Sequence, residues 1–259
     1  MTLPTSIFRY RSLTTFSIAE LATSTMWIAS VDSFNDPFEF QFDIEPLVES
    51  KESREFIISS IVAETGMPRR DVELEFEKYT WDDFRESFVT PQKNLLNEIR
   101  SQGVCCFSAN KDNLLMWGHY CAGHTGFVVE YDTTKFPFQH VVPVEYDDQL
   151  CVFTIQDMIY NMSDCLQKLL VRKSTDWSYE DEYRLIHSRG NNNLSVSHDP
   201  EAIKAIYFGS KCSRQNIEII CNLTNRLRPR YFSCELDSKS YKINFQEMQY
   251  TPPEPKPDD

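Results

Sequence analysis

Apolar residues occur along much of the chain in short runs that are rich in β-branched and aromatic side chains, which is typical of strands. Near the start, these runs predict strands at Ile7–Tyr10 and Met26–Ala29, with a short helix at Ser17–Ala22 between them. Further strands are predicted at residues 104–108, 126–131, 141–146, 182–187, 205–208 and 231–235. Strands therefore dominate the second half of the chain.

Residues 50–100 have a different pattern, because their apolar residues are spaced three or four apart among many charges, as in amphipathic helices. Gly66-Met67-Pro68 divides this segment into helices at Ser50–Thr65 and Arg69–Arg100. Other helices are predicted at residues 113–120, 154–171 and 213–228. We therefore expect a single α+β domain over residues 1–250, with the helices at about 50–101 inserted as an arm.

The composition is that of a folded domain. Of the 259 residues, 41% are hydrophobic and 13% aromatic, yet no apolar run approaches the ~20 residues that span a membrane. Because the N-terminus also lacks a secretory signal, we expect a cytoplasmic protein without a membrane partner and with reduced cysteines. Residues 251–259 are rich in proline and acidic residues, so they are expected to form a disordered tail.

The charge limits the classes of partner. A net charge of −13 opposes general affinity for nucleic acid, since that affinity depends on basic groups that release counterions from phosphates. A nucleic-acid substrate would require a local basic cleft.

Several familiar catalytic motifs are missing from the sequence, including a glycine-rich phosphate loop, Cys-x-x-Cys, G-x-S-x-G and H-E-x-x-H. A group of thiols and imidazoles, Cys105, Cys106, His119, Cys121 and His124, could supply metal ligands, but its spacing matches no standard zinc module. We therefore expect no metal site there.

Four short segments are unusually polar for strands and cores. They are Arg9-Tyr10-Arg11, Phe34-Asn35-Asp36-Pro37-Phe38-Glu39, Met116-Trp117-Gly118-His119-Tyr120 with His124, and residues 177–184 (WSYEDEYR). With a Cys-Phe-Ser strand between the second and third, they resemble in order, across about 180 residues, a prokaryotic family catalogued as domain of unknown function 2971. The resemblance is to a family without an assigned activity.

The order of elements also resembles the ADP-ribosyltransferase superfamily, especially its nucleic-acid-modifying toxins. That resemblance implies a split core of two packed antiparallel sheets, NAD as the substrate, and a toxin-like effector of phage defence or of a toxin–antitoxin pair. The implied partners are a protein or nucleic-acid acceptor and an antitoxin or a phage-derived protein. By the same resemblance Glu182 and Glu180 are catalytic, and the residues expected to contact NAD are Arg9, Tyr10, Arg11, Asn35, Ser108, Trp117 and Tyr120.

The chemistry agrees with these residue types. Breaking the nicotinamide–ribose bond develops positive charge on the ribose, which a nearby carboxylate such as Glu182 would stabilise. Alternation along a strand would place Glu180 and Glu182 on one face. A guanidinium from Arg9 or Arg11 could bind the pyrophosphate through two hydrogen bonds.

Other interpretations remain open for the same residues. His119, between Trp117 and Tyr120, is either a buried hydrogen-bonded residue or an acid–base catalyst. The cleft could belong to a binding module without chemistry that senses a ligand or a phage protein. Alternatively, four carboxylates could bind Mg²⁺ in a nuclease: Asp36, Glu39, Glu180 and Glu182.

Overall fold

The computed structural model describes residues 2–87, 89–188 and 195–251, so residues 252–259 of the expected tail lie outside the described part. The chain forms two compact units. The first, here the sheet unit, comprises residues 1–39, 101–148 and 173–259. The second, here the helical unit, comprises residues 40–100 and 149–172. The expected helical arm lies mostly in the helical unit, which also takes in residues 149–172.

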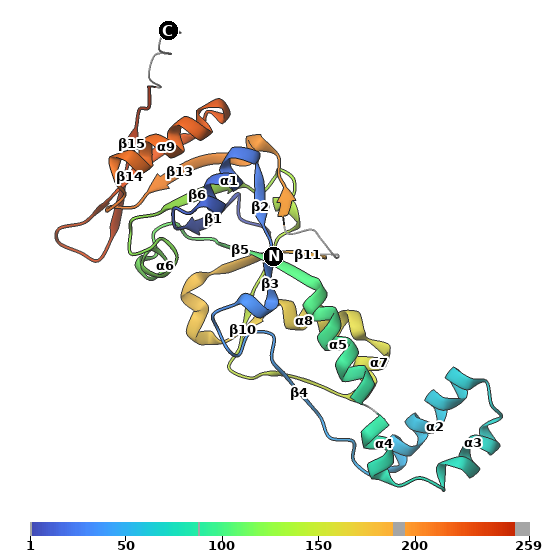
Figure 1. The fold of residues 1–259 in the computed structure, drawn as a ribbon. Helices are drawn as coiled ribbons and strands as arrows, with labels where there is room; N and C mark the ends of the chain where they lie inside the picture. The colour runs from blue at the N-terminus through green and yellow to red at the C-terminus, as the bar shows by residue number, and fades with distance from the viewer. Residues whose placement is uncertain (1, 88, 189–194, 252–259) are drawn as a thin grey trace. The chain divides into compact units, whose positions relative to one another are not determined.

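The sheet unit is built on one nine-stranded sheet (Figure 1). Eight of its strands follow the order β15-β14-β13-β6-β1-β5-β11-β7, and β3 pairs with β5. Their bounds are β1 Ser6–Arg11, β3 Ala29–Ser30, β5 Gln102–Ser108, β6 Phe127–Asp132, β7 Val142–Pro143, β11 Glu182–Ser188, β13 Ile203–Phe208, β14 Arg230–Leu236 and β15 Ile243–Met248. Every pairing is antiparallel except that of β13 with β14, which α9 (Arg214–Thr224) connects.

The expected pair of packed antiparallel sheets is therefore not what the described residues form. Strand β6 pairs with both β1 and β13, and β5 pairs with both β11 and β1, so these strands join into one mostly antiparallel sheet. Smaller strands are β2 (Thr25–Trp27), which pairs with β12 (Ser195–Ser197), and β8 (Glu145–Tyr146) and β10 (Arg172–Lys173).

Two neighbouring strands in the middle of the sheet, β1 and β5, separate along part of their length. Strand β1 pairs with β6 over six residues, but its register with β5 contains a single pair, Phe8 and Ser108. Farther along β5, Val104 and Gly103 pair instead with β3. The Arg9–Arg11 end of β1 is therefore not paired with β5 among the described residues.

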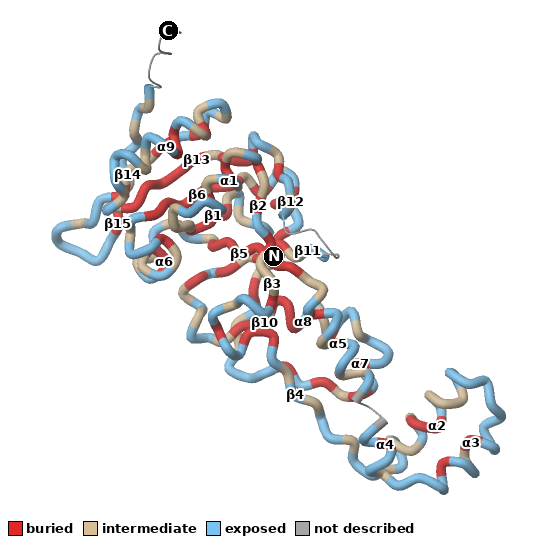
Figure 2. Tube along the Cα trace, in the orientation of Figure 1, coloured by how far each residue is buried: buried red, intermediate tan, exposed pale blue. Residues whose placement is uncertain are grey.

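Helices cover both faces of the sheet. On one face, α1 (Thr15–Thr23) and α9 pack on a core that contains Leu21, Ile206 and Ile220. On the other, α6 (Leu114–Tyr120) contributes Met116 and Trp117 to a second core. Figure 2 shows the central strands mostly buried and the helices buried on one side. The short 3₁₀ turns are η1 Val31–Ser33, η2 Phe138–His140, η3 Thr175–Glu180, η4 Pro200–Ala202 and η5 Asn225–Leu227.

The helical unit contains six helices among the described residues, and a short parallel pair of strands. Their bounds are α2 Lys51–Thr65, α3 Arg69–Phe76, α4 Trp81–Ser87, α5 Val89–Ser101, α7 Ile155–Tyr160, α8 Met162–Val171, β4 Phe42–Ile44 and β9 Cys151–Phe153. The helix predicted over Arg69–Arg100 is broken, and one reason is that Thr80 and Asp83 cap the start of α4 through reciprocal hydrogen bonds. No helix in the described part of the chain has the length and apolar character needed to cross a membrane.

Candidate functional site

A cavity of about 450 Å³ lies where β1 and β5 separate. Eight of the ten residues expected at a site line it: Arg9, Tyr10, Arg11, Asn35, Ser108, Tyr120, Glu180 and Glu182. These come from β1, the turn after η1, β5, α6 and the junction of η3 with β11. Segments that are far apart in the sequence therefore meet in one cavity, whose volume falls in the range of small-molecule sites.

One side of the cavity is cationic. Arg9 and Arg11 project from the same face of β1 and share one carboxylate, Glu20 of α1, at 3.1 and 2.7 Å. Because two arginines face one glutamate, this side of the cavity has a net charge of one positive unit. Arg11 Nε is buried and has no hydrogen-bond partner among the described residues, and Arg9 Nη1 lies near Glu20 without a well-directed hydrogen bond. These donors suit an anionic group of a ligand.

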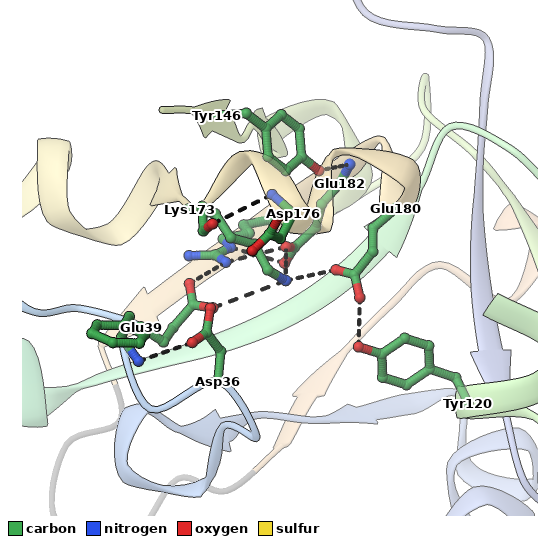
Figure 3. A network of polar contacts seen from close by, with 11 residues as sticks. Asp36, Glu39, Tyr120, Tyr146, Lys173, Asp176, Glu180 and Glu182 are labelled. Carbon is green, nitrogen blue, oxygen red and sulfur yellow. Dashed lines mark hydrogen bonds and ion pairs between the residues drawn. The ribbon is translucent and has the colours of Figure 1, made fainter. Parts of the chain in front are cut away.

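A buried network of charges forms another wall of the cavity (Figure 3). The Lys173 ammonium lies 2.6 Å from Glu180 Oε2 and 2.9 Å from Glu182 Oε2, and 3.9 Å from Glu39 Oε2. All four side chains are at most 5% exposed. One ammonium therefore holds three carboxylates together away from bulk water.

Arg184 supplies the second cation of this network. Its Nε lies 2.8 Å from Glu182 Oε1, and its Nη2 donates to Glu39. Burial alone would raise the pKa of Glu182, but Arg184 and Lys173 outweigh burial and lower it to about 2. Burial prevails at Glu39 and raises its pKa in spite of the same two cations. Three carboxylates against two cations leave the network with one excess negative charge when all are ionised.

The chain places the two site carboxylates by a sharp turn and not by strand alternation. Glu180 ends η3, Asp181 adopts a left-handed conformation with φ of 45°, and Glu182 begins β11. The carbonyl of Asp181 accepts a hydrogen bond from the backbone of Ala109, which fixes the turn against the end of β5. The prediction that both carboxylates lie on one strand is wrong, although both reach Lys173.

Tyr120 connects α6 to the carboxylates. The side chain of Asn113 caps the start of this helix, and Tyr120 is its last residue. The Tyr120 hydroxyl donates to Glu180 Oε1 over 2.5 Å. Burial, followed by this hydrogen bond, raises the pKa of Tyr120 well above its usual range. The phenol therefore stays protonated at neutral pH and acts as a hydrogen-bond donor to Glu180.

Two expected site residues lie elsewhere. Trp117 is fully buried in the core beside Tyr10, and its indole nitrogen donates to the Lys111 carbonyl, so the expectation that it stacks on a cofactor is wrong. His119 is exposed, does not line the cavity and lies 3.3 Å from the Tyr179 hydroxyl. On the short helix α6, these side chains point away from the cavity while Tyr120 faces it.

Some residues of the network were not expected from the sequence. The sequence contains only a weak indication that Lys173 is buried, which is that it closely follows the apolar run at the end of α8. Tyr146 accepts a hydrogen bond from the backbone nitrogen of Glu182, and burial raises its pKa to about 12. A single tyrosine in an apolar strand gives no sequence signal for such a contact.

The carboxylates are not arranged as a metal centre. Within the described ranges, no three His, Cys, Asp or Glu side chains form a group that could hold a metal ion. Asp36 accepts from the backbone of Phe38 in its own turn, while Glu39, Glu180 and Glu182 are in contact with Lys173. The magnesium nuclease interpretation therefore lacks a ligand set in this structure.

The comparisons with known proteins support one of the two resemblances. The model of the family described as Protein of unknown function (DUF2971) matches residues 116–185, which include Tyr120, Lys173, Glu180, Glu182 and Arg184. No curated protein matches the chain, and no solved structure matches it. The family match thus covers part of the cavity and most of the buried charge network, without supplying an activity.

Proposed function

We propose that the cavity of the sheet unit binds NAD and that the protein is an ADP-ribosyltransferase. One observation supports the proposal above all: a cationic pair on β1 and the carboxylates around Lys173 line a single cavity at the opening of the sheet. NAD requires both kinds of group, since its pyrophosphate is anionic and its ribose becomes cationic as nicotinamide leaves.

In the proposed reaction, the bond between the ribose C1′ and the nicotinamide nitrogen breaks, and its electron pair leaves with nicotinamide. A lone pair of the acceptor then forms a bond to C1′, and the acceptor loses a proton. With water as the acceptor, the products are ADP-ribose, nicotinamide and a proton. The acceptor proposed here is a protein or a nucleic acid, as the superfamily resemblance implies.

Arg11, through its unpaired Nε, and Arg9, whose Nη1 also contacts Glu20, are proposed to bind the pyrophosphate. Glu180 and Glu182 are proposed to stabilise positive charge on the ribose. Glu182 has the lowered pKa of about 2 and stays ionised at neutral pH. Tyr120, which donates to Glu180, is proposed to orient that carboxylate.

A second candidate function has a specific observation in its favour. Both oxygens of Glu180 and both oxygens of Glu182 already contact Tyr120, Lys173 or Arg184. Such pairing reduces the negative charge that can act on a ribose. It favours a module that binds a nucleotide in the same cavity without cleaving it.

Two measurements on the purified full chain separate these functions. Calorimetric titration with NAD reports binding, and mass spectrometry of free nicotinamide, with and without cell lysate, reports cleavage. Binding with nicotinamide release supports the transferase. Binding without release supports the module, and absence of NAD binding contradicts the transferase. A role as a toxin-like effector of phage defence, or of a toxin–antitoxin pair, is proposed only together with the transferase.

A further inference from the structure

The helical unit has a groove of its own, with a volume of about 1230 Å³. Residues of α2, α3 and α4 line it, together with the start of α5 and the end of α7. Its apolar floor is formed by Ile57, Val72, Phe76 and Phe84, each less than 9% exposed. The groove is larger than the ~300–1,000 Å³ of ordinary small-molecule sites, so it suits a segment of polypeptide.

Large apolar side chains along this groove are open to solvent. Met67 is 39% exposed, Tyr79 57% and Tyr160 59%. Phe56 packs edge-on against Tyr160, so α2 and α7 are joined beside the groove. Apolar side chains left exposed next to an apolar floor are typical of protein-binding surfaces.

The charged side chains along the groove are all acidic. They are Glu64, Glu75, Asp83 and Glu86, each exposed, and no lysine or arginine is among the lining residues that the structure describes. Lys78 forms an ion pair with Glu75, and Asp83 caps α4. Glu64 and Glu86 make no ion pair with any described residue and are available to a partner.

We propose that this groove binds a basic amphipathic segment of another protein. Its apolar side chains would fill the groove, and its lysines or arginines would face Glu64 and Glu86. This is the arrangement by which a helix commonly docks into an apolar groove. The acidic rim repels phosphates, so it opposes a nucleic-acid partner. The proposal is independent of any chemistry in the sheet unit.

The probe is an 18-residue helical peptide with leucines on one face and lysines on the other, titrated by calorimetry into the full chain. A matched peptide keeps the leucines and replaces each lysine by glutamate. We expect the lysine peptide to bind at least tenfold more tightly. The double variant Glu64→Gln/Glu86→Gln should weaken its binding at least tenfold. Glu49→Gln/Glu52→Gln, which removes the same charge from exposed residues outside the groove lining, should change it little.

A further variant, Met67→Gln, tests the apolar part of the groove and should also weaken binding. Circular dichroism of each variant establishes that it is folded. Equal binding of the two peptides, or equal loss in both double variants, would overturn the proposal. So would sedimentation showing a dimer that Glu64→Gln/Glu86→Gln dissociates, since the occupant would then be a second copy of this chain.

Discussion

The Tyr120 hydroxyl donates a hydrogen bond to Oε1 of Glu180, and the other oxygen of this carboxylate accepts a hydrogen bond from the ammonium of Lys173. Tyr120 is the last residue of α6, and Glu180 lies 60 residues later at the end of η3. Their contact joins two sides of the cavity, so the orientation of Glu180 depends on a phenol from a distant part of the chain.

Replacing Tyr120 by Phe should reduce nicotinamide release by about 10- to 100-fold if Glu180 acts on the ribose, since one oriented hydrogen bond to a charged group contributes ~1.5–3 kcal/mol. The matched control is Tyr179→Phe, which removes a hydroxyl that contacts His119 outside the cavity lining. Turnover is measured at saturating NAD. Equal effects of the two variants would contradict an orienting role for Tyr120.

Arg184→Met should destabilise the sheet unit by about 3–5 kcal/mol, because Glu182 and Glu39 would lose a buried partner. Arg214→Met, which removes an arginine that is 93% exposed, serves as the control and should leave the free energy of unfolding unchanged. Urea unfolding followed by fluorescence measures both. A loss below about 1 kcal/mol for Arg184→Met would show that the network contributes little to stability.

The stability of the wild-type protein should fall in acid partly through Glu182. Its pKa in the folded state is about 2, below the ~4.3 of an unfolded glutamate, so its stabilising contribution is present above about pH 4.3 and is lost as the pH falls towards 2. Glu39 has the opposite effect, because burial raises its pKa. Its ionisation therefore lowers the stability of the folded state as the pH rises. Urea unfolding between pH 2.5 and 6 should give a shallower rise in stability for Glu182→Gln than for wild type. Parallel curves would contradict the lowered pKa.

Arg11→Met should weaken NAD binding by about 10- to 100-fold, the effect of losing one charge-assisted hydrogen bond. Arg9 would remain to balance Glu20, so the variant removes the excess positive charge and should stay folded. Arg54→Met, which changes a half-buried arginine of the helical unit, is the control. Titration calorimetry gives both affinities. Unchanged affinity in Arg11→Met would exclude this residue from the ligand site.

Much of the secondary structure could be predicted, because several elements have strong local patterns. The strands at the centre of the sheet and the helix at Lys51–Thr65 were expected within about two residues of their bounds. Strand β15 was missed although Ile243 and Phe245 alternate with polar residues. The joining of the main strands into one nine-stranded sheet, in place of two packed sheets, depends on which strands pair. Pairing between distant segments has no local signal in the sequence.

The candidate site was predicted mainly from polar residues in otherwise apolar segments. This reasoning found Arg9, Arg11 and Glu182, because a charge in a buried strand must have a partner. It did not predict that Lys173 contacts Glu39, Glu180 and Glu182 together. The prediction for Trp117 was wrong because a tryptophan in a short helix can face either the cavity or the core. In the structure its ring packs against Tyr10 in the core.

The most direct test of the central claim is the amount of nicotinamide released from NAD by the purified full chain, wild type and Glu180→Gln, with cell lysate present. The proposed transferase predicts time-dependent release by the wild type and a reduction of about 100-fold or more in the variant, at equal folded fraction by circular dichroism. If the wild-type protein releases no nicotinamide, the transferase is contradicted. Equal release by both proteins would contradict the role of Glu180.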